Sequence, residues 1–172
     1  IKPHAPGIEK ILKELMSYLE QQGIECLLDE AAASNMNLPD GFPRQDLPGL
    51  SQAIIVLGGD GTLLSVAAAA ARAEVPVIGL NLGRLGFLTE IPLNEALPVL
   101  EAFLKDKNGF ISRRTLLEVN YKDQTDLCLN DIVLNKGALA RMIELQIFIN
   151  GQEVTRLKGD GLILSSPTGS TA

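Results

Sequence analysis

A short glycine-rich segment around one acidic residue is the part of this sequence best suited to chemistry. It reads Gly58-Gly59-Asp60-Gly61-Thr62 and follows an unbroken apolar run at 53–57. Glycines permit positive φ and let a ligand come close to the backbone, and the free N–H groups at the start of a helix attract phosphate. Asp60 is placed to accept a proton from an attacking hydroxyl, to orient that hydroxyl or to help hold Mg²⁺. The alternative is that Asp60 only caps a helix and the glycines only turn the chain.

The segment does not fit two common nucleotide-binding motifs. It is not a Walker A loop, because no Gly-Lys-Ser/Thr follows it. It also departs from the dinucleotide Gly-x-Gly-x-x-Gly pattern, because Leu63 and Leu64 come directly after Thr62. A plain NAD-binding oxidoreductase of the Rossmann type is therefore disfavoured.

The elements expected to position this turn alternate between buried strands and amphipathic helices. Short apolar runs bounded by Gly indicate strands, and apolar residues at helical spacing indicate helices. This alternation predicts an α/β domain with a parallel sheet, Rossmann- or flavodoxin-like. In chain order we expect a helix at 8–22, a strand at 24–28, a long connection without regular structure at 29–50, a strand at 53–57, a helix at 62–73, a strand at 75–80 and a helix at 95–106.

The pattern changes near residue 111 to short strands joined by tight turns. Asn150-Gly151 between two apolar runs is a strong hairpin signal. We therefore expect an α/β nucleotide-binding domain at 1–110 and the beginning of an antiparallel all-β domain at 111–172. The first residue is not Met and the last segment is rich in Gly, Ser and Thr, so we expect a fragment. The strands are expected at 116–121, 127–134, 143–149, 152–158 and 162–166.

Composition narrows the classes of function. The chain has 172 residues, of which 46% are hydrophobic and 21% charged, as in an ordinary globular protein. Its net charge of −6 argues against a nucleic-acid surface and against a polybasic membrane patch. Cys26 and Cys128 form no disulfide framework, which favours the cytoplasm. The single His4 makes no metal site.

Four segments in order carry a resemblance to a known family. Gly58–Thr62 resembles the signature of a kinase superfamily that includes NAD kinases, diacylglycerol and sphingosine kinases, and phosphofructokinases. Asn81–Thr89, Leu129–Asp131 and Asp160–Ala172 resemble further segments of NAD kinases in particular. The chain departs from that family's Asn-Glu motif at Asp131, whose side chain is one methylene shorter than Glu.

The resemblance implies transfer of the γ-phosphoryl group of ATP to the 2′-hydroxyl of the adenosine ribose of NAD, giving NADP. It implies that Asp60 is the proton acceptor. It also implies Mg²⁺ or another divalent cation with ATP, no metal-binding side chain that we can assign, and a homodimer or homotetramer. The phosphate cradle would consist of Gly58, Gly59, Gly61 and Thr62. NAD would be bound by Asp60, Gly61, Phe87, Asn130, Asp131, Arg141, Lys158, Asp160, Thr171 and Ala172.

Two other functions remain open from the residues alone. A lipid kinase of the diacylglycerol or sphingosine type shares the first turn but matches Asn81–Thr89 and Asp160–Ala172 less well. A nucleotide-binding regulatory protein without turnover would keep the glycines and lose the base. The presence of Asp60 weighs against this second alternative.

Overall fold

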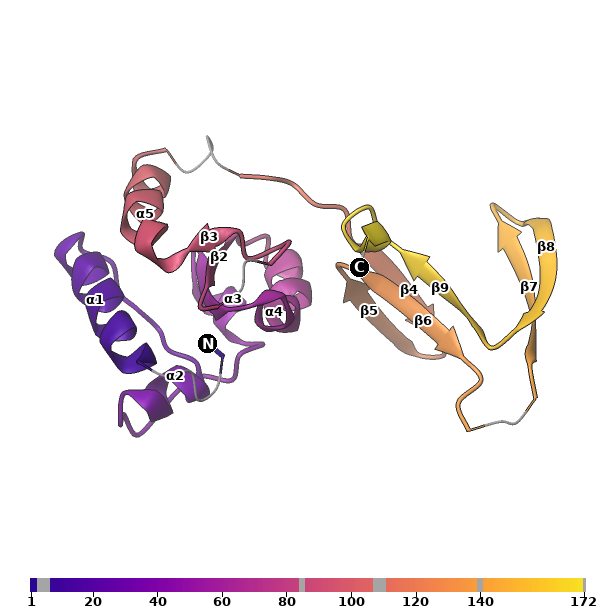
Figure 1. Ribbon diagram of the computed structural model, residues 1–172, viewed down its shortest axis with the longest axis horizontal. Helices are drawn as coiled ribbons and strands as arrows, with labels where there is room; N and C mark the ends of the chain where they lie inside the picture. The colour runs from indigo at the N-terminus through magenta and orange to yellow at the C-terminus, as the bar shows by residue number, and fades with distance from the viewer. Residues whose placement is uncertain (3–6, 84–85, 107–110, 139–140, 172) are drawn as a thin grey trace. The chain divides into compact units, whose positions relative to one another are not determined.

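The computed structural model describes residues 1–2, 7–83, 86–106, 111–138 and 141–171 (Figure 1). The chain divides into two compact units, Ile1–Arg113 and Arg114–Ala172. Each unit has its own secondary structure and is considered by itself below.

The first unit is built on a small parallel sheet. Its strands are β1 (Ile54–Gly58), β2 (Val77–Asn81) and β3 (Ile91–Pro92), in the order β1-β2-β3. The register pairs Gly58 at the end of β1 with Asn81 at the end of β2. The predicted parallel α/β fold is therefore confirmed, and the loops that follow β1 and β2 start side by side at the same edge of the sheet.

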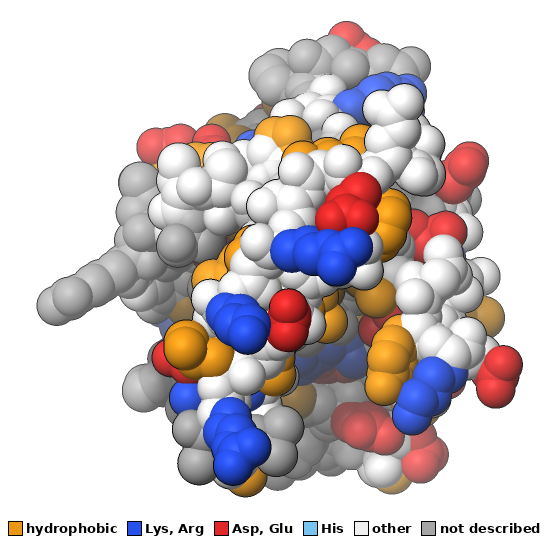
Figure 2. Space-filling model, turned by 90° about the vertical axis from the view of Figure 1, so that its right-hand side faces the viewer, with side chains coloured by type: hydrophobic (Ala, Val, Ile, Leu, Met, Phe, Trp, Pro, Cys, Tyr) orange, Lys and Arg blue, Asp and Glu red, His pale blue; other side chains and the backbone are white. Residues whose placement is uncertain are grey.

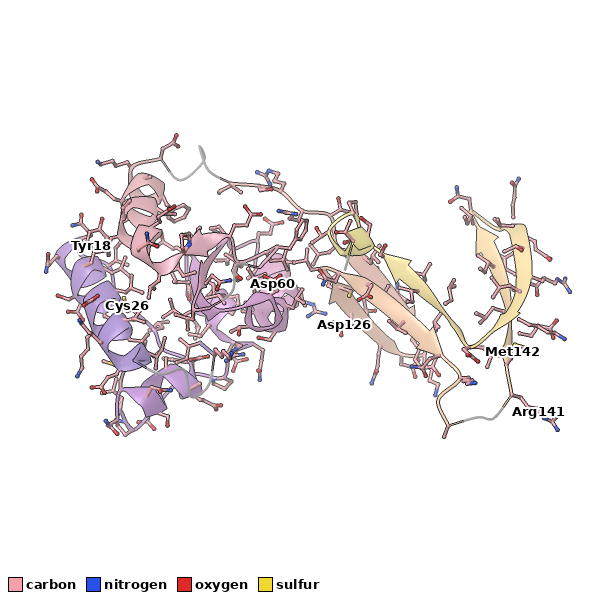
Figure 3. The ribbon with its side chains drawn as sticks, viewed as in Figure 1. Tyr18, Cys26, Asp60, Asp126, Arg141 and Met142 are labelled. Carbon is pink, nitrogen blue, oxygen red and sulfur yellow. The ribbon has the colours of Figure 1, made fainter. Side chains whose placement is uncertain are left out.

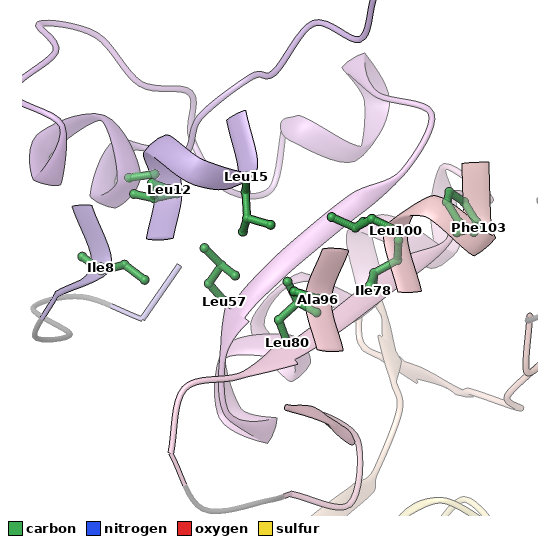
Figure 4. Close-up of a cluster of buried hydrophobic side chains, with 10 residues drawn as sticks. Ile8, Leu12, Leu15, Leu57, Ile78, Leu80, Ala96, Leu100 and Phe103 are labelled. Atoms are coloured by element: carbon green, nitrogen blue, oxygen red, sulfur yellow. The ribbon is translucent and has the colours of Figure 1, made fainter. Parts of the chain in front are cut away.

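Helices cover both faces of this sheet. Leu57, Ile78 and Leu80 pack against α1 (Ile8–Gln21) and α5 (Ala96–Lys105) in one buried cluster (Figure 4). Gly79 points to the opposite face, where an added Cβ would lie 3.0 Å from Leu63 Cδ1 of α4 (Asp60–Arg72). Successive side chains of a strand point to opposite faces, so α4 lies on the face away from α1 and α5. α4 begins directly after β1, which places its N-terminus at the carboxyl edge of the sheet.

The segment from 24 to 50 differs from the prediction. The expected strand at 24–28 does not form, and an isolated bridge joins Asp29 to Phe42 instead. The expected unstructured connection contains α2 (Glu30–Asn35) and α3 (Leu47–Leu50). The cause of α2 is local, because Asp29 Oδ1 accepts the Ala32 N–H at 2.8 Å and caps the helix. A 3₁₀ turn, η1 (Leu93–Glu95), also precedes α5.

The second unit consists of antiparallel strand pairs, as predicted. The pairs are β4 (Leu117–Tyr121) with β5 (Gln124–Cys128), β6 (Asp131–Asn135) with β9 (Gly161–Ser165), and β7 (Ile143–Ile149) with β8 (Gln152–Gly159). A 3₁₀ turn, η2 (Gly169–Thr171), follows β9. Asn150 and Gly151 have φ of 50° and 78°, which are the positive values of a tight hairpin turn.

One strand of the second unit was predicted wrongly. The strand expected at 127–134 is not a single strand, because the chain breaks between β5 and β6 at Leu129 and Asn130. The carbonyl oxygens of these two residues accept hydrogen bonds from Ser166, far along the sequence. A tertiary contact therefore stabilises this break, which lies at the polar pair Asn130-Asp131.

Candidate functional site

Asp60 is the first residue of α4, two residues after the end of β1 (Figure 3). Gly59 is the N-cap, and no side chain caps the helix. The interpretation of Asp60 as a helix cap is therefore wrong. Its carboxylate points instead to the loop that follows β2.

The Asp60 carboxylate accepts four hydrogen bonds from that loop. Oδ1 accepts the backbone N–H groups of Leu88 at 3.0 Å and Thr89 at 2.9 Å, and also the Thr89 hydroxyl at 3.0 Å. Oδ2 accepts the Phe87 N–H at 2.9 Å. These bonds fix both the position and the rotation of the carboxylate against the carboxyl edge of the sheet.

The same bonds determine the charge of Asp60. Burial acts to raise its pKa, but the hydrogen bonds from Thr89, Phe87 and Leu88 outweigh this effect, so the pKa lies below the usual value for Asp. Asp60 is therefore ionised at neutral pH and can accept a further hydrogen bond, a proton or a cation.

The three glycines of the turn serve different purposes. We expected positive φ among them, but none has it, and Gly59 is extended with φ −114°. An added Cβ at Gly58 would lie 2.8 Å from Thr62 Cβ, so packing of the turn itself excludes a side chain there. Gly59 and Gly61 would each place a Cβ in open space. The fold does not need glycine at these two positions, and their bare backbone is open to a ligand.

Gly86 is a glycine whose role we did not predict. An added Cβ would lie 2.7 Å from Asp60 Cγ and 2.8 Å from Thr89 Oγ1. The loop can therefore close on the carboxylate only if residue 86 has no side chain. The next residue, Phe87, has 54% of its surface exposed beside the Asp60 carboxylate that accepts its N–H.

In the second unit, Asn130 lies in a compact turn with the segment after β9. Its carbonyl oxygen accepts the Ser166 N–H at 2.8 Å. The buried Ser166 hydroxyl donates to the Leu129 carbonyl and accepts the N–H groups of Thr168 and Gly169. An added Cβ at Gly169 would lie 2.8 Å from Asn130 Cα. The structure thus joins two of the segments that resembled the family, which are distant in sequence.

The side chain of Asn130 is notable in this turn. Its Oδ1 is buried and has no hydrogen-bond partner among the described residues. Such an oxygen is costly to bury, and a ligand that donates a hydrogen bond to it would remove the cost. Asp131, the first residue of β6, is half-buried, and Thr171 lies exposed in η2. Ala172 lies outside the described residues.

The charged candidates of the second unit lie in different surroundings. Lys158 Nζ is 3.8 Å from Glu144 Oε2 on the neighbouring strand, and Asp160 Oδ1 is 2.7 Å from Lys136 Nζ. Arg141 is exposed, and its side chain points away from the strands (Figure 3). Basic, acidic and hydrophobic side chains are mixed on the face of the molecule that carries β7 and β8 (Figure 2). Local pairing therefore balances part of the charge of these candidates.

Two residues of the site escaped the sequence analysis. Asn81 and Thr89 belong to the loop segment that resembled the family, but no role was assigned to them. The signal available was topological, since loops that follow adjacent parallel strands meet at one edge of the sheet. The register that pairs Gly58 with Asn81 makes this meeting explicit.

The described part of the chain has neither a cluster of metal-binding side chains nor a membrane-spanning helix. No group of three or more His, Cys, Asp or Glu side chains is arranged there to bind a metal ion. None of the helices described is long and apolar enough to cross a membrane.

The structure thus combines a parallel α/β unit, with an acidic, glycine-rich turn between strand and helix, and a second unit of antiparallel strand pairs. Residues 1–108 match the ATP-NAD kinase N-terminal domain, and residues 129–172 match the ATP-NAD kinase C-terminal domain. The chain belongs to the ATP-NAD kinase family.

Individual relatives agree with this membership. The chain is 41% identical over 174 residues to the NAD kinase of Geobacter sulfurreducens and 42% identical over 175 residues to that of Geotalea daltonii. Each match covers 99% of this chain and 61% of the relative, so the chain spans about three fifths of the length of these proteins.

Two solved structures have a similar fold. Yeast NADH kinase complexed with NADH matches with a TM-score of 0.78 and 28% identity, over 99% of this chain and 57% of that one. An NAD kinase from Archaeoglobus fulgidus in complex with ATP matches with a TM-score of 0.69 and 25% identity, over 93% of this chain and 58% of that one.

Proposed function

We propose that the natural protein carrying this sequence transfers the γ-phosphoryl group of ATP to the 2′-hydroxyl of the adenosine ribose of NAD. The observation that carries the proposal is the fixed, ionised Asp60 carboxylate beside the open backbone of Gly59 and Gly61. Similar kinases have been solved in complex with NADH and with ATP. These complexes support ATP as the phosphoryl donor and a nicotinamide dinucleotide as the acceptor.

Asp60 acts on the ribose hydroxyl in this proposal. The carboxylate accepts the 2′-hydroxyl proton while the ribose oxygen bonds to the γ-phosphorus and the bond to ADP breaks. Phosphoryl transfer has a loose transition state with little charge on the attacking oxygen. A carboxylate with a lowered pKa is a weak base, but it suffices when its main task is to orient the hydroxyl and take the proton late.

The glycine-rich turn supplies the anion site. The first N–H groups of α4 have no partner within the helix and attract phosphate oxygens. The bare backbone at Gly59 and Gly61 lets those oxygens come close. Gly58 and Thr62 pack on each other and hold the shape of this cradle.

A divalent cation, Mg²⁺ in our proposal, accompanies ATP. Within the described residues no carboxylate cluster competes for it, and this donor set fits an ion that keeps several waters and binds mainly through phosphate oxygens. The ion would neutralise charge that develops on the phosphates.

The residues proposed to contact NAD are considered for each unit by itself. In the first unit, Phe87, which has 54% of its surface exposed, is the residue proposed to contact the adenine. Asn130 offers its unpaired Oδ1 to a ribose or base donor. The other contacts proposed are Asp131, Arg141, Lys158, Asp160, Thr171 and Ala172, and assembly as a dimer or tetramer in the cytoplasm completes the proposal.

One assay tests the function. The natural protein, expressed in full, is incubated with NAD, ATP and Mg²⁺, and the product is offered to an NADP-specific dehydrogenase. We expect NADP to form. Tight NAD binding without NADP would overturn the proposal in favour of a regulatory binding protein, and phosphorylation of a diacylglycerol would overturn it in favour of a lipid kinase.

A further inference from the structure

Two buried polar residues, one at the end of β2 and one in the loop that follows it, are connected to the Asp60 carboxylate by hydrogen bonds. Asn81 is 5% exposed and Thr89 is fully buried. Asn81 Nδ2 lies 3.0 Å from Thr89 Oγ1, and Thr89 Oγ1 lies 3.0 Å from Asp60 Oδ1. The three side chains therefore form a continuous hydrogen-bonded chain from the end of β2 to the start of α4.

The direction of these hydrogen bonds is determined by their partners. Asn81 Oδ1 accepts the Gly83 N–H at 2.7 Å, and Nδ2 donates to the Thr89 carbonyl at 3.1 Å as well as to its hydroxyl. A flipped amide would set oxygen against oxygen and N–H against N–H. Because the Thr89 hydroxyl already accepts from Asn81, its own proton is directed to the Asp60 carboxylate.

We propose that Asn81 and Thr89 are positioning residues, which hold the Asp60 carboxylate so that Oδ2 is the oxygen that meets the substrate hydroxyl. This inference rests on the proposed phosphoryl transfer and assigns the contact with the substrate hydroxyl to Oδ2 of Asp60. Neither residue needs to touch a substrate, since both act through Asp60.

The division of hydrogen bonds between the two oxygens supports this assignment. Oδ1 accepts three donors, all from Thr89 and Leu88, and has no room for another. Oδ2 accepts one donor, the Phe87 N–H. A carboxylate oxygen has about two lone-pair sites, so Oδ2 retains one for the ribose hydroxyl. Phe87, whose N–H donates to Oδ2, has 54% of its surface exposed.

The surroundings suit a rigid support. Gly79 makes room for Thr89, because an added Cβ at position 79 would lie 3.1 Å from Thr89 Cγ2.

The charged groups on the elements around Asp60 bear on its titration. Arg44 donates a hydrogen bond to Ser65 of α4, and Glu90 is exposed. Arg84 of the same loop lies outside the described residues.

The test compares Thr89→Val with Thr89→Ser in the natural protein expressed in full. Val keeps the shape but removes the hydroxyl, and a hydrogen bond to a charged group is worth roughly a tenfold effect or more. We expect Thr89→Val to lower kcat by about tenfold or more, with a smaller change in KM for NAD, and to move the acidic limb of the pH profile to higher pH. We expect Thr89→Ser, which keeps the hydroxyl, to retain the kcat and the pH profile of the wild type.

Asn81→Asp provides a second perturbation. A carboxylate in place of the amide would draw the Thr89 hydroxyl proton toward position 81 and away from Asp60. We expect the acidic limb to move to higher pH here too. The matched control is Thr155→Val on β8, which removes an exposed hydroxyl of the second unit and should leave kcat and the pH profile unchanged.

The ¹³C chemical shift of the Asp60 carboxyl, titrated with pH in each variant, keeps the inference separate from the proposed function. If the wild type makes no NADP, the proposed function fails, but an upward shift of the Asp60 pKa in Thr89→Val still supports the positioning chain. An active, folded Thr89→Val with an unchanged pH profile and an unchanged Asp60 titration would overturn the inference. A folded Thr89→Ser with a kcat as low as that of Thr89→Val would also overturn the inference.

Discussion

Replacing Asp60 by Asn separates the chemical and structural tasks of this carboxylate. An amide oxygen at the Oδ1 position can still accept the donors from Thr89 and Leu88. The amide nitrogen at the Oδ2 position would then face the Phe87 N–H, so two donors would oppose each other. The variant therefore loses one hydrogen bond to a charged acceptor and weakens the others.

The loss should appear in the free energy of unfolding of the first unit. A hydrogen bond to a charged group contributes about 1.5–3 kcal/mol, so we expect Asp60→Asn to unfold about 2 kcal/mol more easily at pH 7. The folded-state pKa of Asp60 is lowered, so its stabilisation is complete above the unfolded value near ~3.9 and is lost as pH falls through the folded pKa. The difference between wild type and variant should therefore shrink below about pH 4.

The measurements are urea unfolding at several pH values and steady-state kinetics of NADP formation. Loss of the proton acceptor should lower kcat by roughly a hundredfold or more, whereas a displaced loop alone would act mainly on KM. Asp123→Asn, on the exposed turn between β4 and β5, removes the same charge as a control. Equal stability of wild type and Asp60→Asn at pH 7 would refute the anchoring of the loop, and equal kcat would refute the role in proton transfer.

Three further variants test other parts of the structure. Gly86→Ala places a Cβ 2.7 Å from Asp60 Cγ, so the loop must retreat and kcat should fall by about a hundredfold without unfolding of the protein; full turnover with an unchanged melting curve would contradict this. Gly61→Ala should stabilise α4 by about 0.5–1 kcal/mol but raise KM for the nucleotides. The control Gly49→Ala, which also places its Cβ in open space, should leave KM unchanged, and equal KM values for the two variants would argue against ligand approach at the turn. Asp29→Ala removes the N-cap of α2 and the buried partner of a guanidinium, so urea unfolding should show a loss of about 2 kcal/mol or more, and an unchanged midpoint would refute it.

Much of the fold follows from patterns that are local in sequence. The apolar run before Gly58 and the helical spacing after it predicted β1 and α4 to within about two residues at each end. Asn150-Gly151 predicted its hairpin correctly, because the turn chemistry of two adjacent residues determines that geometry. Where a partner distant in sequence decides, the prediction was wrong. The run at 127–134 is broken by Ser166, and the run at 24–28 finds no neighbouring strand.

The candidate site divides along the same line. By itself the sequence determined that Asp60 follows a buried strand within a glycine-rich turn, because residue type and spacing are enough for that. Only the tertiary structure decided what the carboxylate contacts. The parallel pairing of β1 and β2 brings the loop after β2, some thirty residues further along the chain, against Asp60. The hydrogen bonds from this loop, and not the helix that Asp60 begins, determine the orientation and the pKa of the Asp60 carboxylate.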